Sequence, residues 1–274
     1  YHFFNDLRSS LAAHKARPAL LYGGRSWTYA ELNVAAERCA AWLQGEGVTS
    51  GDRVALITPN KLPFLIGHLG VLFAGAVPLP LNPRFTQEEL RYFLSDSGAK
   101  LVMAGVEQQP LLTQLAGELP QLLRIVSDGT CLDPPMHSWR EPTCAATDAC
   151  LILYSSGTTG WPKGVVHTHA NVASSLAALA AVWQMSPDDV VVNVLPLFHI
   201  HGLEFATHLT WLTGGTLLVE DAFDPQQTLA AISRAAAAAV RADSDGRPPE
   251  PQPHGRRTMG PLGFTGDSGL VIPS

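Results

Sequence analysis

Short apolar runs alternate with helix signals along the first 230 residues, and this alternation constrains the fold more than any other feature. The apolar runs fit buried strands at residues 53–58, 77–81, 100–104, 122–127, 150–154, 165–168, 190–195 and 216–220. The segments between them fit helices at residues 28–44, 62–74, 86–95, 171–183 and 203–212. Strands that alternate with helices predict an α/β fold, with layered mixed and parallel sheets flanked by helices.

Two T-x-x-E sequences mark helix starts. Thr28 with Glu31, and Thr86 with Glu89, have the spacing of a capping box, in which each side chain accepts from the other residue's backbone N–H. Asn171 is predicted to cap the helix after residues 165–168.

Composition excludes several classes of protein. Charged residues make up 15% of the chain and hydrophobic residues 46%, so the chain as a whole is not disordered. The net charge of −6 disfavours nucleic acid as a partner, because proteins that bind phosphate backbones carry basic surfaces. The four cysteines, Cys39, Cys131, Cys144 and Cys150, are too few for a disulfide scaffold in a chain of this length. They indicate a reducing compartment, the cytoplasm, with a processed mitochondrial protein as the alternative.

One uncharged stretch resembles a membrane segment. No charged residue lies between Lys61 and Arg84, and a spanning helix needs about 20 apolar residues. Pro63, Pro78 and Pro80 interrupt this stretch, and prolines at that spacing break the hydrogen-bond ladder of a helix. We therefore expect a buried helix followed by a buried strand, and no transmembrane segment.

The composition changes after residue 234. Residues 235–239 are five alanines, and residues 241–274 contain six prolines and six glycines. Such a density of proline and glycine without a period is typical of disorder. We expect one domain over residues 1–234 and an atypical, disordered tail over residues 235–274.

The motif richest in chemistry lies between the predicted strands 150–154 and 165–168. Within ten residues it combines four hydroxyls, three glycines and a lysine: Ser155, Ser156, Gly157, Thr158, Thr159, Gly160, Lys163 and Gly164. Glycines let backbone N–H groups turn toward an anion, hydroxyls add donors, and lysine supplies a point charge suited to phosphate. The motif therefore predicts a polyphosphate site.

This loop is not a Walker A loop. That motif has four residues between its first glycine and Gly-Lys-Ser/Thr, and it opens a helix. Here Gly160 stands three residues before Lys163, and the loop leads into a strand. Binding would depend on backbone N–H groups, hydroxyls and Lys163. The alternative is a flexible hairpin tip that binds nothing.

Several segments together resemble one family. Residues 154–171, YSSGTTGWPKGVVHTHAN, resemble the phosphate loop of the adenylate-forming (AMP-dependent synthetase/ligase) superfamily. Further segments resemble the same family: WTYAEL at 27–32, GDRVA at 51–55, GAVPLPLNP at 75–83 and LPLFHIHGL at 195–203. The resemblance covers residues 3–233 and favours the acyl-CoA synthetase branch, and the H-x-H-G-L run is similar to malonyl-CoA synthetases. It implies that residues 1–234 are part of the large N-terminal domain of such an enzyme.

The resemblance implies a two-step ligase. A carboxylate attacks the α-phosphorus of Mg-ATP to give an acyl adenylate and pyrophosphate, and the thiol of CoA then displaces AMP. The family's pattern assigns seven residues to the phosphates: Ser155, Ser156, Gly157, Thr158, Thr159, Gly160 and Lys163. Lys163 and Thr159 are the candidate catalytic residues, and Thr159 the candidate Mg²⁺ ligand. His199 and His201 would border the pocket for a small carboxylic acid, although His199 also fits a core histidine.

Parts of the family's pattern are missing from the sequence. The sequence contains no Y-G-x-T-E segment, and we expect no C-terminal domain with its lysine. Thr265, Gly266 and Asp267 spell the T-G-D whose aspartate holds the ribose in the family, but they follow the atypical tail directly. We therefore weigh a truncated acyl-CoA synthetase against a non-catalytic nucleotide-binding remnant or an unstable product. An unrelated phosphate-binding α/β domain is a third alternative.

The histidines allow one rival site. His167 and His169 are predicted to alternate on one strand and so share a face, and His199 and His201 have the same spacing. Four imidazoles are suitable zinc ligands. No acidic residue or cysteine beside them completes the set, so the phosphate site is the favoured hypothesis.

Overall fold

Two sheets with parallel central strands form the frame of the chain in this computed structural model, which describes residues 1–155, 161–244 and 270–272, with side chains up to residue 234. Sheet A has the order β11-β9-β10-β1-β2 and sheet B the order β4-β3-β5-β6, while β7 and β8 form a separate antiparallel pair. All neighbours in sheet B are parallel, as are β9, β10 and β1 in sheet A. The predicted α/β fold with mixed and parallel sheets is confirmed.

The strands are short, and most of them are apolar. Their bounds are β1 Pro18–Tyr22, β2 Arg25–Thr28, β3 Arg53–Ile57, β4 Val77–Pro80, β5 Leu101–Ala104, β6 Arg124–Ser127, β7 Ala149–Ser155, β8 Lys163–Thr168, β9 Val190–Asn193, β10 Thr216–Val219 and β11 Leu270–Ile272. The helices are α1 Phe3–Ala13, α2 Tyr29–Gly45, α3 Lys61–Phe73, α4 Gln87–Ser97, α5 Gln109–Ala116, α6 His169–Trp183, α7 Leu209–Thr213 and α8 Pro225–Ser244, with a short 3-10 helix η1, Asp128–Leu132, and a π-helix η2, His201–His208.

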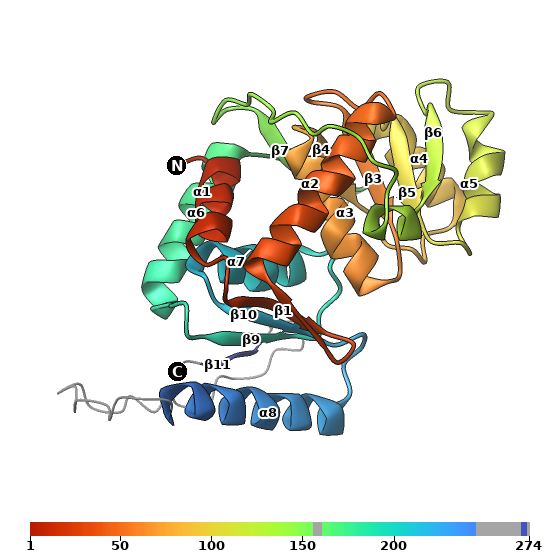
Figure 1. Cartoon of the computed structure of the whole chain (residues 1–274). Coiled ribbons are helices and arrows are strands. Elements are labelled where there is room, and N and C mark those ends of the chain that lie inside the picture. The colour runs from red at the N-terminus through yellow and green to blue at the C-terminus, as the bar shows by residue number, and fades with distance from the viewer. Residues whose placement is uncertain (156–160, 245–269, 273–274) are drawn as a thin grey trace.

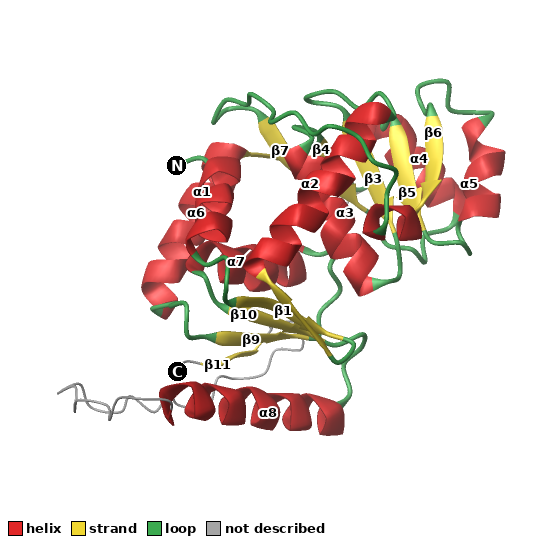
Figure 2. Ribbon diagram, viewed as in Figure 1, coloured by secondary structure: helices red, strands yellow, loops and turns green. Residues whose placement is uncertain are grey.

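Helices cover both faces of each sheet, as parallel strands require. Figures 1 and 2 show α2 and α3 between the two sheets, α8 against the outer face of sheet A, and α4 and α5 beside sheet B. The side chains of β3 follow this layering, because Val54 and Leu56 belong to the central core while Ala55 and Ile57 belong to the core under α4 and α5. The molecule therefore has five layers, from α8 through both sheets to α4 and α5.

Two of the three predicted helix caps are confirmed. Thr28 with Glu31 and Thr86 with Glu89 form reciprocal capping boxes at the starts of α2 and α4. The prediction of Asn171 as a cap is wrong: Thr168 caps α6, and its hydroxyl accepts from the backbone N–H of Asn171. The preceding strand ends at Thr168, which places the cap three residues earlier than predicted.

The uncharged stretch folds as predicted, into the buried helix α3 followed by β4. Among the residues that the structure describes, no helix is long and apolar enough to cross a membrane. The helix α1, the β1–β2 hairpin and α5 were not predicted from the sequence.

Regular structure crosses the predicted boundary at residue 234. Helix α8 continues to Ser244, as an alanine run favours, and β11 pairs antiparallel with β9. Most of the stretch rich in proline and glycine, residues 245–269, lies outside the described residues.

Helices α2 and α3 approach each other through a glycine. A Cβ added to Gly70 of α3 would overlap with Sγ of Cys39 of α2 and lie 2.6 Å from its Cβ. Cys39 is completely buried in the central core. A side chain at position 70 would therefore push the two helices apart.

We expect Gly70→Ala to lower the free energy of unfolding by about 2 kcal/mol, because overpacking a buried contact outweighs the gain in helix propensity. Urea unfolding monitored by circular dichroism measures the change. Gly117→Ala is the matched control, because a Cβ at Gly117 meets no atom closer than 3.8 Å. Equal stability of the two variants would show that α2 and α3 tolerate the added methyl group.

Candidate functional site

The predicted phosphate loop connects the two strands of an antiparallel hairpin. β7 and β8 pair along their length, and Ser155 stands opposite Lys163 at the end where the loop begins. Ser155 Oγ donates to the carbonyl oxygen of Lys163 at 3.4 Å, and both residues are exposed. The predicted strand–loop–strand arrangement is confirmed, and Lys163 is accessible to a ligand.

The structure places only part of the predicted phosphate site. Ser155 and Lys163 lie at the two ends of the loop. Five predicted residues, Ser156, Gly157, Thr158, Thr159 and Gly160, lie outside the described residues, as does Asp267.

The outer edge of β8 is open. Within the described part of the chain, β8 pairs with β7 and with no other strand. Val165 and Val166 in β8 are 46% and 56% exposed. In the described residues, the strand that begins at Lys163 therefore has an unpaired outer edge and two exposed apolar side chains.

The second predicted segment begins at the carboxyl end of β9. Asn193 holds the turn that follows, because its side-chain amide donates to the carbonyl of Gly202 at 2.8 Å and its Oδ1 accepts from the backbone N–H of Leu195 at 3.0 Å. Gly202 itself has no room for a side chain, since a Cβ would lie 2.5 Å from the carbonyl oxygen of Pro196. The turn therefore presents residues 196–201 in one fixed conformation.

A buried lysine also holds this turn. Lys61, at the start of α3, donates from Nζ to the carbonyl oxygen of Leu195 at 2.8 Å. Burial lowers the pKa of its ammonium group. The bond ties the segment after β9 to the helix between the two sheets.

His199 and His201 are both exposed. His201 is the first residue of η2 and packs edge-on against Phe205, with ring centroids 5.2 Å apart, and His199 packs against Phe198 at 4.6 Å. The alternative of a buried core histidine at position 199 is therefore wrong. Their exposure keeps both rings available to line a pocket.

The zinc hypothesis is wrong for the part of the chain that the structure describes. His167 lies in β8, whereas His169 begins α6, so the two do not alternate on one strand. His169 is buried and stacks on His2 with centroids 4.7 Å apart. Across the described residues, no three His, Cys, Asp or Glu side chains lie together as metal ligands would.

One buried carboxyl group was not identified from the sequence. Glu204, in the π-helix η2, is 2% exposed, and its Oε1 lies 3.4 Å from Nδ1 of His167 but accepts no hydrogen bond. Burial raises the pKa of Glu204 to about 7 and lowers that of His167. The Glu204 carboxyl is therefore protonated more readily than an ordinary glutamate, and the His167 ring less readily than an ordinary histidine. Single π-turns often occur at functional sites, but the sequence has no pattern that marks one.

The contact between Glu204 and His167 joins the two predicted segments. His167 lies on the strand that leaves the phosphate loop, and Glu204 lies three residues after His201. A second buried pair lies farther along η2, where Nε2 of His208 is 2.8 Å from Nε2 of His68 in α3. Both imidazoles have lowered pKa values because they are buried, so both stay neutral.

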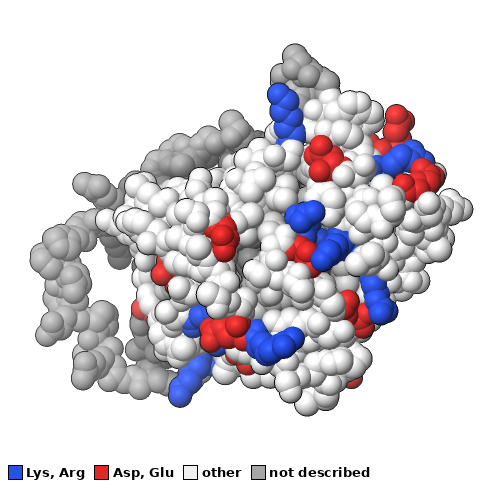
Figure 3. Space-filling view, turned by 90° about the horizontal axis from the view of Figure 1, so that it is seen from above, with Lys and Arg blue, Asp and Glu red and all other residues white. Residues whose placement is uncertain are grey.

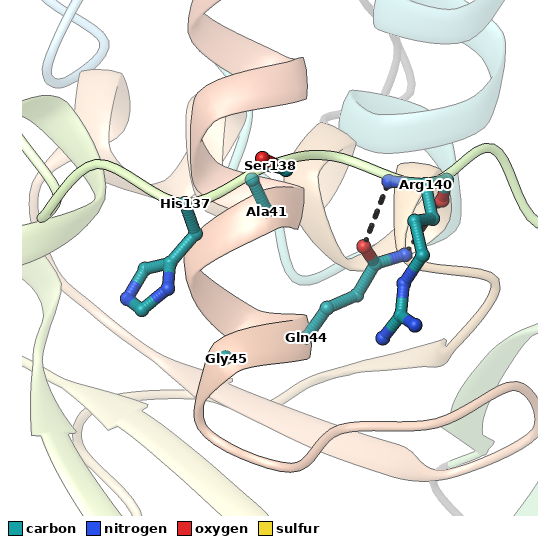
Figure 4. A pocket seen from close by; sticks show the side chains of 6 residues that line it. All are labelled: Ala41, Gln44, Gly45, His137, Ser138 and Arg140. Atoms are coloured by element: carbon teal, nitrogen blue, oxygen red, sulfur yellow. Dashed lines mark hydrogen bonds between the residues drawn. The ribbon is translucent and has the colours of Figure 1, made fainter.

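A surface hollow lies apart from the elements that carry these residues. It has a volume of about 270 Å³ and is lined by Ala41, Gln44, Gly45, His137, Ser138 and Arg140 (Figure 4). The amide of Gln44 occupies its wall and bonds both the backbone N–H and the carbonyl of Arg140, at 3.0 and 2.8 Å. The amide groups there are thus already paired with protein, and the hollow contains no predicted site residue.

Charged side chains are sparse on the surface. On the face shown in Figure 3, Lys and Arg lie near Asp and Glu, with wide uncharged areas between them. Several are paired, such as Arg91 with Glu118 at 2.6 Å and Arg25 with Glu31 at 3.4 Å. Exposed pairs of this kind contribute little to stability.

Comparison with known proteins gives consistent matches. A sequence model of the family described as AMP-binding enzyme matches residues 7–240. The long-chain-fatty-acid–CoA ligase FadD13 of Mycobacterium tuberculosis is 36% identical over 204 residues, which cover 72% of this chain and 40% of that protein. The mitochondrial malonate–CoA ligase ACSF3 of Bos taurus is 33% identical over 181 residues, which cover 63% of this chain and 30% of that protein.

The fold matches a solved structure over most of the chain. The crystal structure of ATP-bound MatB from Rhodopseudomonas palustris has a TM-score of 0.79 and 31% identity, covering 85% of this chain and 48% of that one. The chain therefore spans less than half the length of each of these three proteins.

Glu204 makes stability depend on pH in a defined direction. Its pKa is about 7 in the folded protein against an ordinary value of 4.5, so its contribution is complete below pH 4.5 and is lost as pH rises through 7. We expect the stability of Glu204→Gln relative to the native chain to increase by roughly 2 kcal/mol between pH 5 and pH 7.5. Urea unfolding at both pH values measures it.

The comparison between variants is necessary because three buried histidines, His68, His169 and His208, have lowered pKa values. They reduce the free energy of unfolding as pH falls, whereas Glu204 increases it. Glu107→Gln, at an exposed position, is the control and should show no such change. A pH-independent difference for Glu204→Gln would mean that Glu204 is ionised at its ordinary pKa.

Proposed function

Because the chain belongs to the AMP-binding enzyme family, we propose that it supplies the phosphate-binding hairpin and part of the acyl pocket of an ATP-dependent acyl-CoA synthetase. The match over residues 7–240 confirms the resemblance found in the sequence. The observation that carries the proposal is the β7–β8 hairpin, which presents Ser155 and Lys163 side by side at the mouth of the glycine-rich loop.

The proposed chemistry is the activation of a carboxylic acid. A carboxylate oxygen attacks the α-phosphorus of ATP, the bond from that phosphorus to the bridging oxygen breaks, and pyrophosphate leaves with the electron pair. The sulfur of CoA then attacks the acyl carbon, AMP leaves, and the thiol proton passes to solvent. Charge develops on the leaving phosphates, and donors held in place around them stabilise it.

Lys163 is the residue we propose to neutralise that charge. It is exposed at the start of β8, and no acidic side chain is within ion-pairing distance of its ammonium group in the described part of the chain. Ser155 offers a hydroxyl beside it. Magnesium would arrive with the triphosphate and supply further positive charge, and Thr159 remains our candidate ligand for it.

The acid is proposed to lie near His199 and His201. Both rings are exposed at the start of η2, on a turn fixed by Asn193 and Lys61. The names of the relatives span a long-chain fatty acid and malonate, so we propose a carboxylic acid as the substrate class, with a small acid favoured by the H-x-H-G-L run.

A second candidate function is nucleotide binding without ligation, because the pairing of Ser155 with Lys163 supports a phosphate site independently of any acyl transfer. Exchange of labelled pyrophosphate into ATP, dependent on added carboxylate, separates the two functions. Exchange supports the synthetase, whereas binding of Mg-ATP without exchange supports the second candidate.

We expect Mg-ATP to stabilise the chain against thermal unfolding. At about 100 times the dissociation constant the gain is roughly 2.7 kcal/mol, and it should largely disappear in Lys163→Ala. Differential scanning fluorimetry over a series of Mg-ATP concentrations measures it. Lys15→Ala removes an exposed lysine elsewhere and should leave the shift unchanged. An undiminished shift in Lys163→Ala would refute our assignment of Lys163.

A further inference from the structure

One helix, α4, contacts both ends of the phosphate-loop hairpin. Tyr92 and Asp96 are four residues apart in α4, so they lie on the same side of the helix. Asp96 contacts the strand that enters the loop, and Tyr92 contacts the segment that leaves it. No motif in the sequence marked either residue.

The entry to the loop is fixed by Tyr154. Its hydroxyl donates to Oδ2 of Asp96 at 2.6 Å, and its ring packs against Phe93 with centroids 4.6 Å apart. Burial and the neighbouring Asp96 raise the pKa of Tyr154, so the hydroxyl remains a donor. The ring also covers Gly164 on the opposite strand, where an added Cβ would lie 3.3 Å from it.

The exit from the loop is fixed by Tyr92. Its hydroxyl donates to the carbonyl oxygen of Pro162 at 2.8 Å. Its ring stacks on Trp161, with centroids 4.7 Å apart and planes 25° apart. Trp161 is 50% exposed, so this stack is the main support that the structure shows for its indole ring.

The support itself is rigid. The other side of α4 packs into the core beside sheet B through Leu90, Phe93 and Leu94, which are at most 2% exposed. The capping box of Thr86 and Glu89 fixes its first turn. Ser155 and Lys163 stand opposite each other between the two contacts, one residue from Tyr154 and from Pro162 respectively.

We propose that Tyr92 and Asp96 are positioning residues, which hold the two ends of the loop so that Ser155 and Lys163 meet a triphosphate in a fixed arrangement. The proposal rests on the proposed function, because it assumes a polyphosphate ligand. A two-stranded hairpin is only marginally stable by itself, and holding its loop end in the binding conformation reduces the entropy that binding must overcome. The strength of ATP binding should therefore depend on α4, which contains no predicted phosphate ligand.

Three variants remove the contacts between α4 and the two ends of the loop step by step. Tyr92→Phe removes the bond to Pro162 and keeps the stack, Tyr92→Leu removes both, and Tyr154→Phe removes the bond to Asp96. Tyr22→Phe is the matched control, because the Tyr22 hydroxyl donates to Asp221 at 2.7 Å, also at an exposed site. Isothermal calorimetry with Mg-ATP gives the dissociation constant, and thermal unfolding without ligand gives stability.

We expect Mg-ATP to bind about fivefold more weakly to Tyr92→Phe and to Tyr154→Phe, and more weakly still to Tyr92→Leu, with Tyr22→Phe unchanged. A purely structural role would lower the unfolding temperature of the tyrosine variants and leave the affinity alone. Native affinity in Tyr92→Leu and Tyr154→Phe would overturn the proposal.

A second measurement needs no nucleotide. Hydrogen exchange of the amides of residues 163–166 reports how firmly the hairpin is held, and it should accelerate in Tyr92→Leu and Tyr154→Phe but not in Tyr22→Phe. If the native chain fails to bind Mg-ATP, the proposed function fails. Hydrogen exchange of these amides still decides whether α4 holds the hairpin. Unchanged exchange in both variants would refute the positioning role.

Discussion

The close approach of α2 and α3 at Gly70 and Cys39 is the contact on which the other layers depend. Both helices lie in the central core, between the inner faces of sheets A and B. All residues of α3 except Leu62 are buried, and its apolar side chains belong to the core that both sheets share. Because protein interiors pack as densely as organic crystals, a change in the distance between these helices must be transmitted to both sheets. Lys61, at the start of α3, connects this helix to the turn before His199 through its hydrogen bond to the carbonyl oxygen of Leu195.

The hairpin that carries Lys163 is attached to this frame from three directions. Successive residues of β7 enter different cores, with Leu151 and Leu153 in the central one and Ile152 in the one beside sheet B. α4 contacts both ends of the loop, and Glu204 meets His167 where β8 ends. The phosphate segment and the segment with His199 and His201 are thereby held by packing and side-chain contacts on either side of the loop, which is the kind of second layer of support that functional sites need.

Local chemistry was predictable from the sequence, and long-range pairing was not. The capping boxes, the buried α3 and the strand–loop–strand motif each depend on residues a few positions apart, and all are confirmed. Tyr92 is 70 residues from Pro162, and Asp96 is 58 residues from Tyr154, so no periodicity could reveal that they meet. The same reason hid the contact of Glu204 with His167. The two H-x-H pairs led to the opposite error. Their local spacing suggested that His167 and His169 share one strand, but His167 lies in β8 and His169 begins α6.

The open edge of β8 has a consequence for how the chain behaves in concentrated solution. Among the residues that the structure describes, the outer edge of β8 offers free backbone N–H and C=O groups beside the exposed side chains of Val165 and Val166, which is the arrangement that recruits strands from other molecules. Two copies can extend one another's sheet by pairing β8 with β8, and Lys163 at its start is the kind of charge that opposes such pairing. Neutralising Lys163, by mutation or by a bound polyanion, removes the charge that opposes pairing of β8 between molecules. The tendency of the chain to associate is therefore linked to the charge of its ligand site.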